Sequence, residues 1–181
     1  MKRLMVCAAA LLLHGTLLQA ETLNLRIFTF SGAGIQLYYP DTISGSDRYI
    51  WHASAGIGLQ VVHALALEGE FRFGGIIYAD RGYSRLMGGN MGVRVQYMPE
   101  RGRWTDFLYF RGGMSFEQFD RMRNDMMFLG VYMAPGLGIS LGSSKRFFLD
   151  NELFFQKTFP DIDGAMGHWR IGIRGALRLV L

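Results

Sequence analysis

The last thirteen residues, 169–181, alternate between apolar and polar side chains. The odd-numbered positions are Trp, Ile, Gly or Leu, and the even-numbered positions include Arg170, Arg174 and Arg178. Because successive side chains point to opposite faces of a strand, this spacing places the apolar residues on one face and three arginines on the other. In a helix the same residues would mix around the circumference. The segment is therefore predicted to be a β-strand.

Seven more segments alternate in the same way. They are 22–39, 49–62, 64–79, 85–98, 103–117, 126–142 and 145–157. In the first, Phe28 and Phe30 are large apolar residues on the polar face. Beyond the N-terminus no uncharged apolar run of about 18 residues exists, which excludes a bundle of membrane-spanning helices. With 14% aromatic and 19% charged residues the chain is also unlike a disordered one. It is predicted to be all-β, with eight strands.

Strand length and composition indicate which face points outward. The segments exceed the roughly 5–6 residues of a typical soluble strand and match the roughly 9–11 that cross a membrane. The polar face mixes charges with many of the 24 glycines, as expected where side chains share a narrow lumen. Connections at 62–64, 98–103 and 142–145 are expected to be short, and those at 40–48, 79–85, 117–125 and 157–167 longer. A soluble secreted barrel would alternate too, with its apolar face inside. We predict an eight-stranded antiparallel up-and-down transmembrane β-barrel with its apolar face outside.

The N-terminal residues have the pattern of a signal peptide. Lys2 and Arg3 precede an apolar stretch that runs from Leu4 to Leu13, and small or polar residues follow as far as Ala20. A core helix of a cytosolic protein is the alternative. The prediction is a signal peptide over 1–20, cleaved near Ala20, and a barrel over 21–181. Cleavage of the signal peptide would remove Cys7, the single cysteine, so no disulfide is expected.

Amphipathic aromatic residues lie near the ends of the predicted strands. Rings of this kind collect at the two membrane interfaces. The predicted aromatic belts consist of Tyr39, Tyr49, Trp51 and Trp169 at one end, and Tyr97 and Trp104 at the other. Outer-membrane lipid is the partner that this arrangement implies.

The inward face is predicted to hold many charged side chains. They are Arg26, Glu68, Glu70, Arg72, Arg94, Arg111, Glu117, Asp150, Glu152, Arg170, Arg174 and Arg178. The interior of an eight-stranded barrel is only wide enough for its own side chains, and buried charges need partners. An ion-pair network that plugs the lumen is therefore expected.

Antiparallel pairing of the predicted hairpins suggests which charges meet. In the last hairpin, Asp150 and Glu152 should lie beside Arg174. In the hairpin formed by 64–98, Arg94 should lie near Glu68 and Glu70.

Catalytic, metal and cofactor sites are not predicted. The four histidines, at positions 14, 52, 63 and 168, have no ligand spacing. After leader removal the only lysines are Lys145 and Lys157, and the arginines are spread singly along the chain. Nucleic-acid binding, which needs clustered basic residues, is therefore not expected.

Three motifs carry a resemblance to a known family. They are Tyr109-Phe110-Arg111-Gly112-Gly113, Ala134-Pro135-Gly136-Leu137-Gly138 and the terminal strand from Trp169 to Leu181. With them the whole mature chain resembles the small eight-stranded outer-membrane proteins of diderm bacteria, the group of OmpW, the OmpA transmembrane domain and the opacity proteins. Members usually end in an aromatic residue, whereas this chain ends in Leu181.

The resemblance implies a location in the bacterial outer membrane, reached with periplasmic chaperones and the barrel-assembly machinery. OmpW-like members are associated with the passage of small hydrophobic molecules, for which Phe28, Phe30, Tyr132 and Phe154 would supply an apolar section of the lumen. The alternative is a structural or adhesive surface protein that meets a host partner.

A lipid A-modifying enzyme is the remote alternative. Deacylases of this fold use a His-x-Ser pair on the lipid-facing side, but His52 and Ser54 fall on the polar face. The chain is therefore not expected to be an enzyme.

Overall fold

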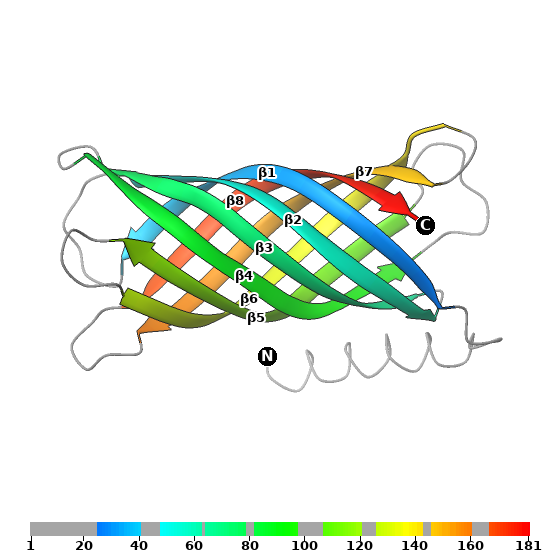
Figure 1. Cartoon of the computed structure of the whole chain (residues 1–181), viewed down its shortest axis with the longest axis horizontal. Coiled ribbons are helices and arrows are strands. Elements are labelled where there is room, and N and C mark those ends of the chain that lie inside the picture. Colours follow the sequence, from blue (N-terminus) through cyan, green and yellow to red (C-terminus); the bar gives the residue numbers. More distant parts are fainter. Residues whose placement is uncertain are drawn as a thin grey trace, which may run out of the picture.

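A computed structural model describes residues 25–40, 48–62, 64–78, 82–97, 107–120, 126–142, 146–160 and 167–181. Eight long strands make up nearly all of this part of the chain (Figure 1). They are β1 (Arg26–Pro40), β2 (Arg48–Val62), β3 (Leu65–Tyr78), β4 (Gly82–Tyr97), β5 (Phe107–Asp120), β6 (Met126–Ser140), β7 (Phe147–Pro160) and β8 (His168–Val180). The signal peptide predicted for 1–20 lies outside the described residues.

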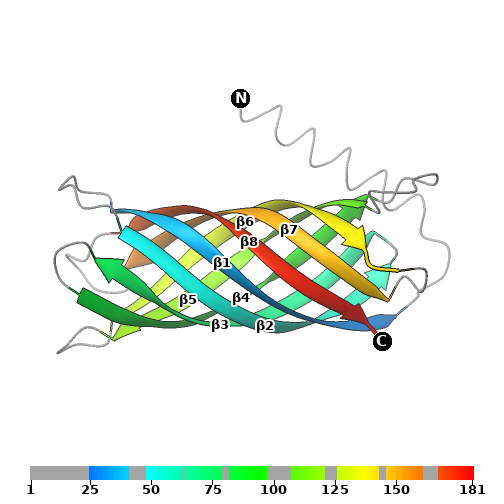
Figure 2. The same ribbon diagram turned by 90° about the horizontal axis from the view of Figure 1, so that it is seen from above.

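The strands form one closed antiparallel barrel in which each pairs with its neighbours in sequence. Closure comes from β1 and β8, which pair from Phe28–Val180 to Pro40–His168. The strands run obliquely to the barrel axis, as closure of a sheet requires (Figure 2). The start of β1 and the end of β8 lie at the same end of the barrel, which we call the terminal end. The opposite end we call the loop end.

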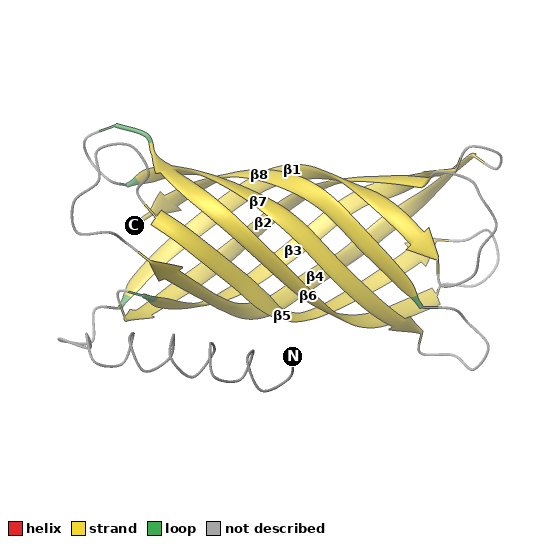
Figure 3. Cartoon of the chain, turned by 180° about the vertical axis from the view of Figure 1, so that it is seen from behind, coloured by secondary structure: helices red, strands yellow, loops and turns green. Residues whose placement is uncertain are grey.

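Figure 3 shows strands throughout the described part of the chain, with short connecting residues between them. Within that part, no helix has the length and apolar character needed to span a membrane.

Side chains alternate between lumen and outer surface with the predicted polarity. In β8, Arg170, Arg174 and Arg178 are at most 4% exposed, whereas Trp169 and Ile173, at alternate positions, are 52% and 64% exposed. Large apolar side chains thus cover the outside while charged side chains fill the inside. This arrangement is the inverse of a soluble barrel and confirms the predicted transmembrane class.

Inward-facing glycines make room for aromatic rings on the adjacent strand. Phe28 and Phe30 of β1 pair with Gly58 and Gly56 of β2. Tyr109 of β5 likewise pairs with Gly136 of β6. A Cβ atom at any of these glycines would overlap the facing ring. The mixture of large and small residues on the polar face therefore lets aromatic rings fit into a narrow lumen.

Two connections do not follow the predicted lengths. At the loop end, 79–81 is short although a longer connection was expected at 79–85, because β4 already begins at Gly82. At the terminal end, 98–106 is longer than the expected 98–103 turn, because β5 begins only at Phe107. The predicted contrast between short and long connections is thus wrong at these two places. Periodicity alone could not determine where the strands end. The alternation of apolar and polar residues can continue into a turn or stop before the strand does.

Candidate functional site

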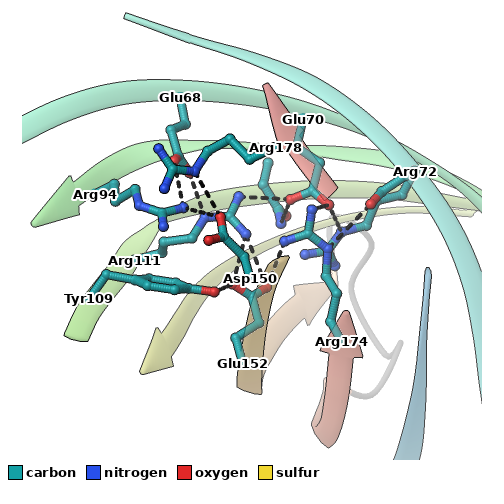
Figure 4. Close-up of polar contacts among 12 residues, drawn as sticks. Glu68, Glu70, Arg72, Arg94, Tyr109, Arg111, Asp150, Glu152, Arg174 and Arg178 are labelled. Carbon is teal, nitrogen blue, oxygen red and sulfur yellow. Dashed lines mark hydrogen bonds and ion pairs between the residues drawn. The ribbon is translucent and has the colours of Figure 1, made fainter. Parts of the chain in front are cut away.

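Arg111 lies at the centre of a buried ion-pair network that crosses the lumen (Figure 4). Its Nε donates to Glu68, its Nη2 lies 2.9 Å from Oε2 of Glu70, and its Nη1 lies 3.0 Å from Oε1 of Glu152. Glu68 and Glu70 belong to β3, whereas Glu152 belongs to β7. One guanidinium thus links three strands through its fork of five N–H donors.

Arg174 forms a second link between the same two acidic strands. Its Nη2 is 3.0 Å from Oε1 of Glu70, and its Nη1 is 2.8 Å from Oε1 of Glu152. The Nε donates to the Ser54 hydroxyl at 3.2 Å. Arg174 and Arg111 therefore share both carboxylates, so each carboxylate is bound by more than one cation (Figure 4).

Asp150 organises the part of the network nearest the terminal end. Its Oδ2 accepts from Arg94 at 2.8 Å and from Arg178 at 3.0 Å. The Arg94 guanidinium also lies 3.7 Å from the centre of the Tyr109 ring, and that of Arg178 lies 4.3 Å from the centre of the Phe148 ring. Stacking on these aromatic faces adds to the ion pairs.

Glu117 organises the part nearest the loop end. Arg170 binds it with two parallel contacts, one of them 2.7 Å from Nη1 to Oε1. The same guanidinium lies 2.7 Å from Nε2 of His168. Arg72 approaches Glu117 at 4.0 Å and Glu70 at 3.5 Å, and so connects this group to the central one.

The charges of the network nearly balance. In the described part of the chain the lumen contains six buried arginines and five buried carboxylates. A buried charge without a partner costs several kcal/mol, whereas each carboxylate here contacts at least two arginines. The network therefore ties opposite walls together and occupies the middle of the lumen.

The architecture matches solved structures at low sequence identity. Neisserial surface protein A aligns with a TM-score of 0.62 and 10% identity, over 84% of this chain and 96% of that one. The outer membrane protein OprG from Pseudomonas aeruginosa gives 0.52 and 8%, over 85% and 96%. Ail, the attachment invasion locus protein of Yersinia pestis, gives 0.50 and 10%, over 85% and 98%. The chain has the fold of the small eight-stranded outer-membrane β-barrels. No family model and no curated protein matches the sequence.

Apolar side chains pack inside the barrel on both sides of the network. Toward the loop end, Ile50, Ile76, Leu86 and Phe128 form a buried cluster. Toward the terminal end, Phe28 and Phe30 pack with Ala66, and Tyr109 packs with Phe148. The loop-end cluster was not singled out from the sequence. The sequence pattern did indicate them, because these four residues occupy the same inward-facing alternate positions as the charged lumen residues, as Phe28 and Phe30 do.

The barrel brings together nearly all of the predicted lumen charges, with three differences. Arg26 has the inward parity but is exposed at the start of β1. Arg94 pairs with Glu68 at 3.5 Å and with Asp150, and no Glu70 contact is described for it. Arg174 lies opposite Glu152 as predicted, whereas Asp150 pairs with Arg94 and Arg178 instead. Hairpin pairing could not anticipate the contact between Arg94 and Asp150, because these side chains meet across the lumen from strands far apart in sequence.

The side chains assigned to the predicted aromatic belts point outward where they are described. Tyr49, Trp51 and Trp169 point outward near the loop end, and Tyr97, 67% exposed, points outward near the terminal end. Trp169 also lies 5.0 Å from the ammonium of Lys157. The side chain of Tyr39 and all of Trp104 lie outside the described residues.

The His52 and Ser54 pair lies inside the barrel. The two side chains are 2% and 7% exposed and face the lumen from β2. Ser54 accepts its hydrogen bond from Arg174, not from the histidine. Within the described ranges, no group of three or more His, Cys, Asp and Glu side chains is arranged to hold a metal ion. His52 and Ser54 thus belong to the polar interior of the barrel.

Proposed function

We propose that this protein is a closed, non-conducting barrel of the bacterial outer membrane that displays its loop-end connections at the cell surface, as structural or adhesive surface proteins do. The observation that carries the proposal is the lumen network centred on Arg111, which joins β3, β5 and β7. Apolar clusters flank the network on both sides. With the lumen filled, the connecting segments are the parts able to meet a partner.

The composition of those segments indicates what kind of partner they suit. The loop-end connections 41–47, 79–81, 121–125 and 161–166 carry six aspartates and three arginines. The terminal-end connections 63–64, 98–106 and 141–146 carry two acidic and four basic residues, besides one histidine. A net negative loop end favours partners with basic groups, because complementary charge raises the rate and specificity of association.

Electrical recording in planar bilayers tests the closed lumen. The wild-type barrel should give no ohmic conductance on the nanosiemens scale, whereas a variant with Arg111, Arg174 and Glu152 all changed to alanine should conduct. Lys157→Ala, which alters a charge on the outer surface, is the matched control and should stay silent. A wild-type barrel that conducts steadily would overturn the proposal.

Attachment to surfaces tests the role of the loop end. Cells that display the protein should bind a basic partner surface, and replacement of 41–47 and 161–166 by glycine-serine linkers should abolish this binding. The same replacement of 98–106 should leave it unchanged. Equal binding by all three versions would exclude a surface role for these loops.

Passage of small hydrophobic molecules is the second candidate. Ile50, Ile76, Leu86 and Phe128 favour it, because an apolar cluster at the loop end could receive an apolar solute. Uptake of a fluorescent apolar probe into vesicles that contain the protein separates the two functions. Uptake that exceeds protein-free vesicles and is abolished by Leu86→Asp would favour passage over the closed barrel.

A further inference from the structure

The outer surface has a groove at mid-height that crosses β6, β7, β8 and β1 and reaches β5 and β2 at its edges. Its volume is about 830 Å³. Asn151, Gly175 and Ala33 line its floor, and larger apolar side chains such as Leu153, Ile173 and Ile35 rise beside them. Strand pairing explains the shape, because Asn151 lies opposite Gly175 and Gly175 lies opposite Ala33. Three small or short side chains thus form one continuous row across three strands.

Asn151 is out of place on this surface. Along β7 the outward side chains on either side of it are Phe147, Leu149, Leu153 and Phe155, so its amide lies in the middle of the apolar band. The side chain is exposed, and no hydrogen bond links it to another described residue. Hydrocarbon offers no donor or acceptor, so an amide at this depth is stabilised only by a protein partner.

We infer that the groove is the surface by which two copies of this chain pair within the membrane. Copies inserted in the same direction place Asn151 at the same depth, so a two-fold axis along the membrane normal brings the two amides together. Each amide offers both a donor and an acceptor, so the two are complementary. The short side chains at Gly175 and Ala33 let the two backbones approach closely, as small residues do between membrane segments.

Beyond the groove, larger apolar side chains point outward at the same height. On β4, β5 and β6 these include Met91, Met114 and Val131, which are 51–66% exposed. Such side chains suit contact with lipid. Pairing of two copies through the lipid-facing wall does not depend on what the loops bind.

Energy transfer between labelled copies in lipid vesicles tests the inference. Donor and acceptor dyes are attached at Ser143→Cys, in a connection at the terminal end, with Cys7→Ser to remove the other thiol. For the wild type, energy transfer should persist as the ratio of lipid to protein rises. It should fall only when the copies are too dilute to associate. Asn151→Leu should weaken association about tenfold, since it removes the paired amides. Gly175→Leu, which fills the groove, should abolish transfer.

Matched controls carry the same chemical changes elsewhere on the outer wall. Gln118→Leu removes an outward amide from β5, and Gly69→Leu enlarges an outward glycine of β3 that has open space around it. Both should associate like the wild type, and all variants should keep the heat-modifiable gel mobility of a folded barrel. A wild type that is monomeric at every lipid ratio, with lipid chains in the groove, would overturn the inference. So would equal losses in the Asn151 and Gln118 variants.

Discussion

Glu152 of β7 lies directly opposite Arg174 of β8, with 2.8 Å between Oε1 of the carboxylate and Nη1 of the guanidinium. Glu152 also binds Arg111, and Arg174 also binds Glu70. The pair is therefore part of a network. Removing one charged side chain leaves other charged side chains buried with fewer ion-pair partners.

Arg174→Ala should destabilise the barrel more than the double variant Arg174→Ala with Glu152→Ala. The single change leaves a buried carboxylate short of a partner, which typically costs about 3–5 kcal/mol, whereas removing both partners can be nearly neutral. Urea unfolding in detergent micelles, followed by tryptophan fluorescence, measures the difference. Equal losses would indicate a hydrated lumen with weak pairing and would reopen the case for a conducting pore.

Gly113→Ala should impair folding, whereas Gly175→Ala should be tolerated. A Cβ atom at Gly113 would collide with the backbone of Met91 and Gly92 on β4, which no side-chain rotation relieves. At Gly175 the nearest atom would be Oδ1 of Asn151 at 3.8 Å, an ordinary contact. We expect a loss of about 1–3 kcal/mol for Gly113→Ala. The folded fraction after refolding into vesicles, read from gel mobility, gives the result, and similar yields for both variants would contradict it.

Trypsin added to intact cells should cleave at Arg121 or Arg123, at the loop end between β5 and β6. An even number of strands places both chain ends on the periplasmic side, so the loop end faces outward. We therefore predict surface exposure of Asp41–Arg48, Gln118–Asp125 and Thr158–Gly167, which lie mostly outside the described residues. Mass spectrometry of the released fragments identifies the cleavage site. Cleavage at Arg101 or Arg103 instead would mean that the barrel is inserted the other way round.

His52→Ala should leave the lipid A composition of cells unchanged. The imidazole is 2% exposed and points toward the lumen from β2, whereas lipid contacts the outer wall. Mass spectrometry of extracted lipid A, compared between cells with the wild type and with the variant, provides the measurement. Loss of a deacylated species in the variant would show that the barrel is an enzyme after all.

Alternation by itself determined the strand class, the number of strands and the face on which each side chain lies. Arg170, Arg174 and Arg178 could be assigned to the lumen because side chains alternate with a period of two, and one shifted position would have inverted every assignment. The sequence also indicated that Glu152 faces Arg174, since a hairpin fixes the register of adjacent strands. Phe28 and Phe30 were placed inside correctly for the same reason.

Only the closed barrel decided which distant charges meet. Arg94 and Asp150 belong to β4 and β7, and no local pattern connects them until the sheet closes and narrows the lumen to the reach of two side chains. Closure likewise aligned Asn151, Gly175 and Ala33 into one groove, because β8 pairs with both β7 and β1. Periodicity describes one strand at a time. Contacts across the lumen and grooves across the wall depend on strand register and curvature, which arise only when all eight strands pair.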